Sequence, residues 1–299
     1  MEEYISDNSL YIRSKNNSMI NRKMIGRVLG MLLFIELGMF LLCAGVSAGY
    51  GESDYKYFLY TCIINAVVGG LLLLYGRGAE NKMSRRDGYC VVTLSWVFFT
   101  FFGMLPFYFS GSIDTITNAF FETMSGFTTT GATILDDIES LSHGMLFWRS
   151  LTQWIGGLGI VFFTIAILPI FTTGGVQLFS AESTGVTHDR THPKINVMAK
   201  WLWTIYLVLT VSETVLLMFG GMSLFDAICQ SFATTATGGY STKQNSISYW
   251  NSPYIEYVVA IFMIVSSINF SLFLMCLKGK VGRLFKDEEL HWFLASVGR

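Results

Sequence analysis

The stretch from Tyr57 to Tyr75 contains no charged side chain along its whole length. An α-helix needs about 20 predominantly apolar residues to cross the hydrocarbon core of a bilayer. Tyrosine at both ends of such a stretch is typical of the membrane–water interface. Further apolar stretches of similar length lie at about 24–49, 89–109, 145–170, 201–219 and 254–277. The pattern predicts an all-α polytopic membrane protein with six spans.

The composition agrees with a membrane protein and argues against several other classes. Of the 299 residues, 52% are hydrophobic and 14% are charged, whereas soluble domains have about 25% charged residues. The chain has no basic stripe with interleaved aromatic residues, so we expect no nucleic-acid binding. Its five cysteines form no CxxC pair, which indicates neither a disulfide framework nor a zinc site. We find no triad, phosphate loop or soluble pair of carboxylates, and predict that the protein is no enzyme and binds no cofactor.

Lysine and arginine are distributed unevenly between the segments that join the spans. One set of segments carries most of them, from Arg13 in the N-terminal tail to Lys286 near the end. The other set carries only Lys56 and Lys243, with Arg149 close to it. Cytoplasmic segments of membrane proteins hold the excess of positive charge. We therefore expect both termini in the cytosol, and Lys56 and Lys243 outside.

A loop rich in threonine and glycine occurs twice between the spans. Residues 118–124 align with 226–232, and residues 129–133 align with 237–241, each 108 positions later and without a gap. A repeat of span, loop and span is the organising unit of such a chain. Each loop segment is too short to cross a bilayer. We expect it to enter from outside as a short helix and to return as extended backbone, which a membrane tolerates where protein or a wet cavity surrounds it.

The chemistry of these two loops suits a monovalent cation. Backbone carbonyls can replace the water shell of such an ion without a fixed charge that would hold it too tightly. Glycine lets the chain turn without a Cβ in the way, and the C-terminal end of the short helix points its negative dipole at the same place. An external loop without any role in ion binding is the alternative, and the duplication in register argues against it. The predicted ion ligands lie at Thr129, Thr130, Gly131, Thr237, Gly238 and Gly239.

Acidic residues follow the first loop on its outer side. Asp136, Asp137 and Glu139 would raise the local concentration of cations at the mouth of a pore. An ordinary solvated loop would have the same residues.

Four ionisable residues, Glu36, Glu122, Arg149 and Glu213, lie within or beside apolar spans. Charged groups inside a membrane are candidates for function, but we favour a structural role for most of them. For Glu122 and Arg149 we hypothesise an ion pair behind the first loop. We expect His143 to be a loop or surface residue.

Four stretches together give the chain a family resemblance, and they are Phe120–Ala132, Trp154–Ile160, Gly174–Glu182 and Thr237–Thr242. The chain resembles the Trk/Ktr/HKT superfamily of potassium and sodium transporters along nearly its whole length, and it looks closest to the TrkH-type membrane subunit. The resemblance implies a helix hairpin followed by helix–pore loop–helix repeats around one pore. It also implies potassium as the substrate, with Gly131 and Gly239 as filter glycines that favour potassium over sodium.

The resemblance further implies location in the bacterial inner membrane, a homodimer, and a cytosolic nucleotide-binding regulatory subunit of the TrkA type. Family members carry four repeats in one chain, whereas this sequence holds two. Residues 287–294 resemble the beginning of a third repeat. We interpret the chain as a fragment or truncated product, or else as a half-length subunit that assembles in pairs around one pore.

The spans and repeats divide the chain into six predicted segments. These are a cytosolic tail at 1–23, a transmembrane hairpin at 24–87, a first repeat at 88–175, a cytosolic linker at 176–197, a second repeat at 198–279 and a cytosolic lead-in at 280–299.

Three functions compete at this point. The first is a potassium-conducting subunit that is incomplete in this chain, and the second is a non-conducting partner of a full-length subunit or of its regulatory ring. The third is a secondary carrier, which inverted repeats would favour. Both loops are expected to enter from the same side, which counts against a carrier.

Overall fold

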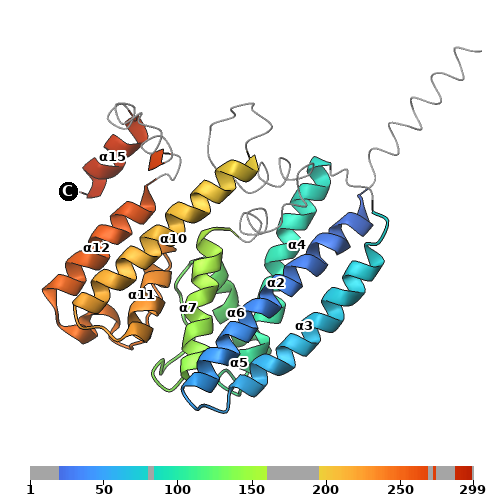
Figure 1. Cartoon of the computed structure of the whole chain (residues 1–299), viewed down its shortest axis with the longest axis horizontal. Coiled ribbons are helices and arrows are strands. Elements are labelled where there is room, and N and C mark those ends of the chain that lie inside the picture. The colour runs from blue at the N-terminus through green and yellow to red at the C-terminus, as the bar shows by residue number, and fades with distance from the viewer. Residues whose placement is uncertain (1–19, 80–83, 160–194, 269–271, 274–286, 298–299) are drawn as a thin grey trace, which may run out of the picture.

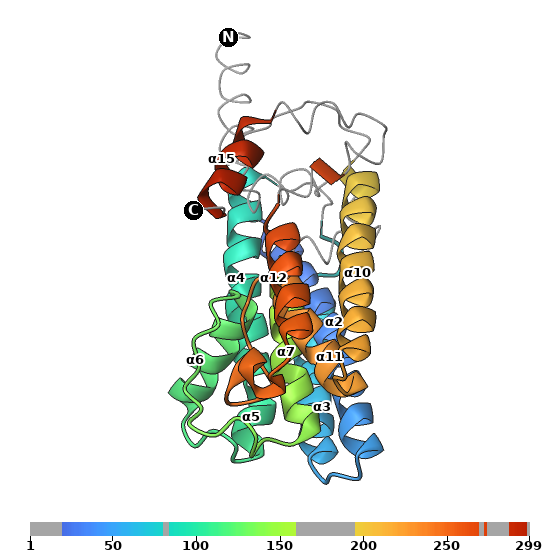
Figure 2. The ribbon, with the colours of Figure 1, turned by 90° about the vertical axis from the view of Figure 1, so that its left-hand side faces the viewer.

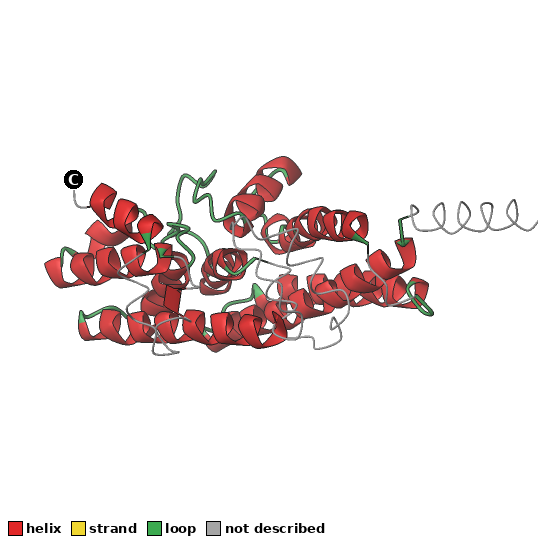
Figure 3. Cartoon of the chain, turned by 90° about the horizontal axis from the view of Figure 1, so that it is seen from above, coloured by secondary structure: helices red, strands yellow, loops and turns green. Residues whose placement is uncertain are grey.

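The structure, a computed structural model, describes residues 20–79, 84–159, 195–268, 272–273 and 287–297. In this part of the chain every regular element is a helix (Figures 1 and 3). The α-helices are α2 (Arg22–Gly49), α3 (Tyr55–Tyr75), α4 (Arg85–Gly103), α5 (Leu105–Phe109), α6 (Ile116–Phe127), α7 (His143–Gly157), α10 (Ile195–Phe219), α11 (Leu224–Thr235), α12 (Pro253–Ser267) and α15 (Glu288–Val297), with a 3₁₀-helix at Ser246–Trp250.

Helices α2 and α3 form an antiparallel hairpin whose backbones touch at glycines. A Cβ added to Gly30 would stand 2.8 Å from the carbonyl oxygen of Gly69, and one added to Gly26 would stand 3.0 Å from the ring of Tyr75. Small residues allow such close approach of membrane helices. The outer face of α3 exposes large apolar side chains, as contact with lipid requires. These include Tyr60, Ile63, Val67, Leu71 and Leu74.

Helix α4 starts and stops at identifiable signals. Ser84 and Asp87 form a capping box at its N-terminus, and Asp87 also accepts a hydrogen bond from the Asn21 amide at the start of α2 (2.8 Å). The helix ends at Gly103, and α5 begins after Met104 with Pro106 in its first turn. Proline lacks the amide hydrogen that would continue the preceding helix. The span predicted over 89–109 is therefore two helices joined at Met104.

The two repeats have the same local construction. Helices α6 and α11 are each 12 residues long, and their N-caps, Thr115 and Ser223, lie 108 positions apart. The Thr115 hydroxyl accepts from the Asn118 amide (3.2 Å), and the Ser223 hydroxyl accepts from the Asp226 amide (3.1 Å). The predicted fold class, a helix hairpin plus two helix–pore loop–helix repeats, is thus confirmed.

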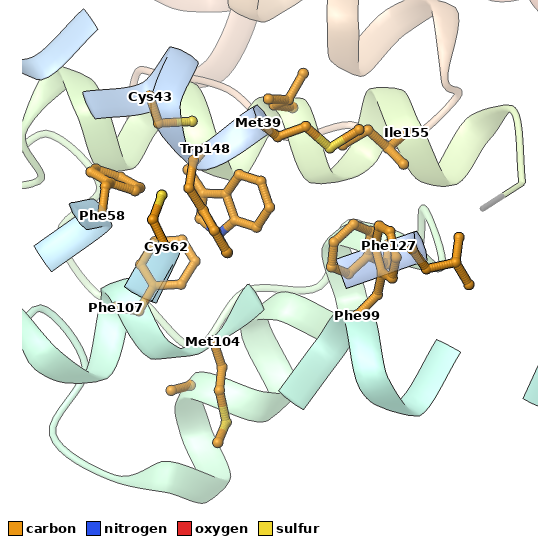
Figure 4. Close-up of a cluster of buried hydrophobic side chains, with 14 of the residues drawn as sticks. Met39, Cys43, Phe58, Cys62, Phe99, Met104, Phe107, Phe127, Trp148 and Ile155 are labelled. Atoms are coloured by element: carbon orange, nitrogen blue, oxygen red, sulfur yellow. The ribbon is translucent and has the colours of Figure 1, made fainter. Parts of the chain in front are cut away.

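A cluster of large aromatic side chains joins the hairpin to the first repeat (Figure 4). Trp148 of α7 is fully buried, and its ring lies 4.6 Å from Phe40 of α2 and 6.0 Å from Phe127 of α6. Its indole nitrogen donates to the carbonyl oxygen of Gly103 (2.8 Å). The ring is thus removed from solvent, and its one polar atom still has a hydrogen-bond partner.

Four described helices are long and apolar enough to cross a membrane: Arg22–Gly49, Tyr55–Tyr75, Arg86–Phe109 and Lys200–Phe219. The apolar helix Pro253–Ser267 is shorter. The other two predicted spans, at 145–170 and 254–277, continue into ranges that lie largely outside the described residues. Also outside the described residues are most of the predicted tail at 1–23, most of the linker at 176–197 and part of the lead-in at 280–299.

Two helices end inside the spans predicted for them. Helix α7 ends at Gly157, and Gly159 then adopts a positive φ of 74°. Gly156 packs against the carbonyl of Phe127, where a larger residue would clash, so the glycine run marks a close contact and a helix end. Helix α12 stops at Ser267, because Ile268 is extended (φ −73°, ψ 140°).

Candidate functional site: two Thr/Gly loops and the polar cluster behind them

The two predicted ion-binding loops adopt the same unusual backbone conformation. We call residues 128–134 the first loop and residues 236–242 the second loop. Thr129 and Gly131 have φ values of 52° and 76°, and Thr237 and Gly239 have 54° and 86°. In an extended chain successive peptides point in opposite directions. A positive φ at every second residue turns alternate peptides over, so that neighbouring carbonyl oxygens can face the same side.

An equivalent backbone hydrogen bond closes the helix before each loop. The Thr130 amide donates to the carbonyl oxygen of Ser125 (2.9 Å), and the Gly238 amide donates to that of Ala233 (2.8 Å). Such a bond closes the C-terminus of a helix and lets the chain turn away sharply. The C-terminal ends of α6 and α11, which carry partial negative charge, therefore adjoin the loops directly.

The structure brings the two loops into contact at their glycines. The carbonyl oxygen of Gly238 lies where a Cβ on Gly131 would have to stand, so no other residue fits at position 131 without movement. At Gly239 the corresponding space is open, and only the positive φ restricts the residue type. The six predicted ligand positions thus lie in one region, with Gly238 buried and the others at least partly accessible.

Two hydroxyl groups of the first loop, those of Thr128 and Thr130, bond to each other. The Thr128 and Thr130 hydroxyls are 2.8 Å apart, and Thr128 also donates to the carbonyl oxygen of Met124 (2.7 Å). This arrangement braces the turn.

Behind the first loop, Glu122 and Arg149 form the hypothesised ion pair. Arg149 Nε lies 2.7 Å from Glu122 Oε1, and the two side chains are 2% and 0% exposed. The carboxylate also accepts from the Thr133 hydroxyl (2.9 Å) and the Ile134 amide (2.9 Å). A buried ion pair is tolerated when further hydrogen bonds satisfy both partners. Thr133 therefore supports this pair, a role that was not predicted.

Two residues that sequence reasoning missed complete the arrangement. Tyr240 follows Gly239, and its amide donates to Gln153 Oε1 (3.0 Å). The ring of Tyr240 lies 3.6 Å from the guanidinium carbon of Arg149. We call Glu122, Arg149, Gln153 and Tyr240 the polar cluster. Two signals were present in the sequence: a polar residue within an apolar span at 153, and a large one after small residues at 240.

The polar cluster is carried by α6, by α7 and by the loop that follows α11. These three helices lie in the lower half of the molecule in Figure 2. Helix α7 contacts both α6 and α11. It therefore carries Arg149 and Gln153 to the back of both loops.

The three acidic residues that follow the first loop differ in their surroundings. Glu139 pairs with Lys243 (3.3 Å) and accepts from the Gln244 amide (3.2 Å). Asp136 and Asp137 are exposed. Of these three acidic residues, Glu139 forms a salt bridge with a cationic side chain in the described part of the chain, and Asp136 and Asp137 do not.

His143 is the first residue of α7 and has a specific partner. Its amide and its ring nitrogen Nδ1 lie 2.9 Å and 2.7 Å from Glu52 Oε1 in the turn between α2 and α3. Burial raises the pKa of Glu52, but the hydrogen bonds from His143 and Gly144 outweigh it and leave the pKa below its usual range. The carboxylate thus caps the N-terminus of α7, where negative charge is favourable.

The remaining two glutamates in the spans are buried and face polar neighbours. Glu36 accepts from Asn65 Nδ2 (3.0 Å) between α2 and α3. Glu213 lies on α10 and accepts from the Thr235 hydroxyl (3.4 Å) at the end of α11. Both contacts join helices, which agrees with the structural role expected for these residues.

Comparison with known proteins gives consistent matches. The family model TrkH, described as a cation transport protein, matches residues 55–295. The Trk system potassium uptake protein TrkH of Escherichia coli K12 is 40% identical over 273 residues, which are 90% of this chain and 56% of that protein. TrkG of the same organism is 32% identical over 275 residues, 91% of this chain and 57% of that protein.

Among solved structures, the crystal structure of the potassium transporter TrkH from Vibrio parahaemolyticus matches with a TM-score of 0.78 at 33% identity. The match covers 92% of this chain and 56% of that one. The chain therefore spans little more than half the length of the relatives it matches.

Proposed function

Because the chain belongs to the TrkH family of cation transport proteins, we propose that it forms part of the pore of a Trk-type system for potassium uptake across the plasma membrane. The ion would be coordinated by backbone carbonyls of residues 129–131 and 237–239. The relatives named as potassium uptake proteins support potassium as the substrate.

One observation carries the proposal beyond family membership. The two loops share positive φ values at positions 108 residues apart, and they touch each other at Gly131 and Gly238. A loop with only a structural role would not need the same alternation twice. Oxygens that face one side from two adjoining loops are what a dehydrated cation requires.

Two loops enclose an ion only in part. We propose that conduction needs further loops of the same kind, supplied by additional repeats or by a second copy of the chain. A homodimer and a cytosolic nucleotide-binding subunit of the TrkA type belong to the same proposal. A non-conducting role as a partner of a full-length subunit is the alternative.

Orientation is also part of the proposal. The N-terminus would be cytosolic, with Lys56 and Lys243 outside. Cysteine substituted for Lys243 should react with an impermeant reagent in intact cells, whereas cysteine substituted for Lys82 should react only after permeabilisation. Labelling of position 82 from outside would contradict this topology.

The filter is tested by serine substitutions in a chain that carries four repeats, made by joining this one to the second half of a TrkH relative. Gly131→Ser meets the Gly238 carbonyl, and Gly239→Ser is strained by its positive φ. We expect both to lower the ratio of potassium to sodium uptake, with about 1–3 kcal/mol of backbone strain at each site.

Gly221→Ser is the matched control, because Gly221 has a positive φ of 95° and open space but lies in the turn before α11. It should leave the uptake ratio unchanged. Wild-type selectivity and rate in both filter variants would show that these loops do not bind the ion. Uptake by the two-repeat chain as a dimer would favour assembly from two copies, and uptake by its monomer would contradict the need for further loops.

A further inference from the structure

The two loops are supported unequally. The first repeat has the buried pair of Glu122 and Arg149. The position 108 residues after Glu122 holds Gln230. Helix α12 begins 110 positions after α7, so the counterpart of Arg149 is Val259, an apolar residue. Among the described residues, the second repeat therefore has no ion pair in the equivalent place.

The second loop takes its support from the first repeat instead. Arg149 Nη1 donates to the carbonyl oxygen of Ser241 (3.0 Å), and the guanidinium group also lies over the Tyr240 ring. Gln153, one turn further along α7, accepts from the Tyr240 amide. One helix thus holds the backbone of the second loop at two neighbouring residues.

Tyr240, in the second loop, in turn binds the backbone of the first repeat. Its hydroxyl lies 2.9 Å from the carbonyl oxygen of Glu122 and 3.2 Å from that of Ala132 in the first loop. Ala132 is itself the residue 108 positions before Tyr240. The first loop therefore has no side chain that could make the same contact in the opposite direction.

We propose that Arg149 and Tyr240 are positioning residues that hold the two loops at a fixed separation, and that this separation sets the discrimination between potassium and sodium. The second part rests on the function proposed above. Carbonyl oxygens that cannot close around the smaller ion favour the larger one. A link between loops of different repeats opposes that movement directly.

The residue types suit this task. Arginine presents several donors in a rigid plane, so Arg149 can bind Glu122 with Nε and Ser241 with Nη1 while its face lies on the ring. Lysine would keep the charge but not the fixed geometry. Phenylalanine at position 240 would keep the ring and remove only the hydroxyl.

The test uses hydrogen–deuterium exchange of the purified chain in lipid nanodiscs, with Tyr240→Phe as the main variant. The readout is exchange in the first loop, about 100 residues away in sequence, where the Ile134 amide is bonded to Glu122. We expect this exchange to become about five-fold faster, the factor that corresponds to the loss of one ordinary hydrogen bond. A peptide from α3 should be unchanged and shows that the fold is retained.

Tyr257→Phe is the matched control, since it makes the same chemical change at an exposed position in the second repeat, and it should leave the first loop unchanged. Arg149→Lys should also accelerate exchange in both loops. An effect of Tyr240→Phe confined to the second loop, or equal to that of the control, would overturn the proposed link.

Ion selectivity separates this inference from the proposed function. In the four-repeat chain, Tyr240→Phe should lower the ratio of potassium to sodium uptake several-fold, while Tyr257→Phe should not. Unchanged selectivity in Tyr240→Phe, where Gly131→Ser does reduce it, would overturn the role of the link in discrimination. Unchanged selectivity in Gly131→Ser would instead overturn the function of the loops, and the exchange experiment would still decide whether the link exists.

Discussion

The buried pair of Glu122 and Arg149 allows a quantitative prediction about stability. Removing one partner of a buried ion pair costs about 3–5 kcal/mol, because the other charge is left without compensation. In Arg149→Met, the carboxylate of Glu122 keeps the Thr133 hydroxyl and the Ile134 amide as donors. We therefore expect a loss at the low end of that range, about 3 kcal/mol.

The second single variant should cost less. In Glu122→Gln, the amide oxygen can still accept from Arg149 Nε, and the guanidinium group keeps Ser241 and the Tyr240 ring. We expect a loss of about 2 kcal/mol, the value of a hydrogen bond to a charged group. The double variant leaves no buried charge. It should cost about 3 kcal/mol rather than the sum of about 5, which is a coupling energy of about 2 kcal/mol.

The assay is reversible unfolding in detergent micelles by added SDS, followed by circular dichroism. The exposed pair of Glu139 and Lys243, whose side chains are 40% and 23% exposed, serves as a control. Exposed pairs contribute about 0.2–1 kcal/mol, so Glu139→Gln and Lys243→Met should each have a small effect. Additive losses in the Glu122 and Arg149 variants would refute the reasoning, because they would mean that the two charges do not stabilise each other.

Two further predictions concern the hairpin and its outer turn. Gly30→Ala should lower the free energy of unfolding by about 1–3 kcal/mol in the same assay, because its Cβ would stand 2.8 Å from the Gly69 carbonyl oxygen. Gly38→Ala is the control, since a Cβ there meets open space and should be tolerated. Equal effects of the two substitutions would contradict the close helix contact. The pKa of Glu52 is lowered in the folded protein. Its capping contact therefore stabilises the fold fully at pH values above the unfolded pKa of about 4.3. This contribution is lost as the pH falls through the folded pKa. Glu52→Gln should therefore lower stability at pH 7 by less than about 1 kcal/mol and weaken its dependence on pH below about 4.3. An unchanged acid profile would contradict a role for this carboxylate.

Features set by local sequence were predictable. The run from Tyr57 to Tyr75 gave the second helix within two residues, since α3 begins at Tyr55. The duplicated loops predicted both short helices, because residues 118–124 and Gly131 recur 108 positions later as residues 226–232 and Gly239. Each of these signals lies within one short segment of the sequence or in its repeat. It can therefore be recognised before the fold is known.

Contacts between repeats were not predictable in the same way. The Tyr240 hydroxyl reaches Glu122 across 118 positions, and its amide reaches Gln153 across 87. No spacing rule links such positions, since they meet only through the packing of α7 against α11. Even the pair of Glu122 and Arg149, 27 positions apart, was a hypothesis from charge alone. The glycines near 157 both permit a close contact and end the helix there.

Thr129 in the first loop and Thr237 in the second loop share one energetic cost. Thr129 and Thr237 both hold positive φ values, 52° and 54°, although left-handed backbone costs a residue with a Cβ about 1–2 kcal/mol and is least suited to β-branched side chains. Glycine would relieve that strain, but it would also widen the range of conformations open to the loop. The threonines therefore make each loop less stable and at the same time stiffer. Substitutions chosen for thermal stability at these positions would tend to make the loops more flexible, and would weaken the ion recognition proposed above.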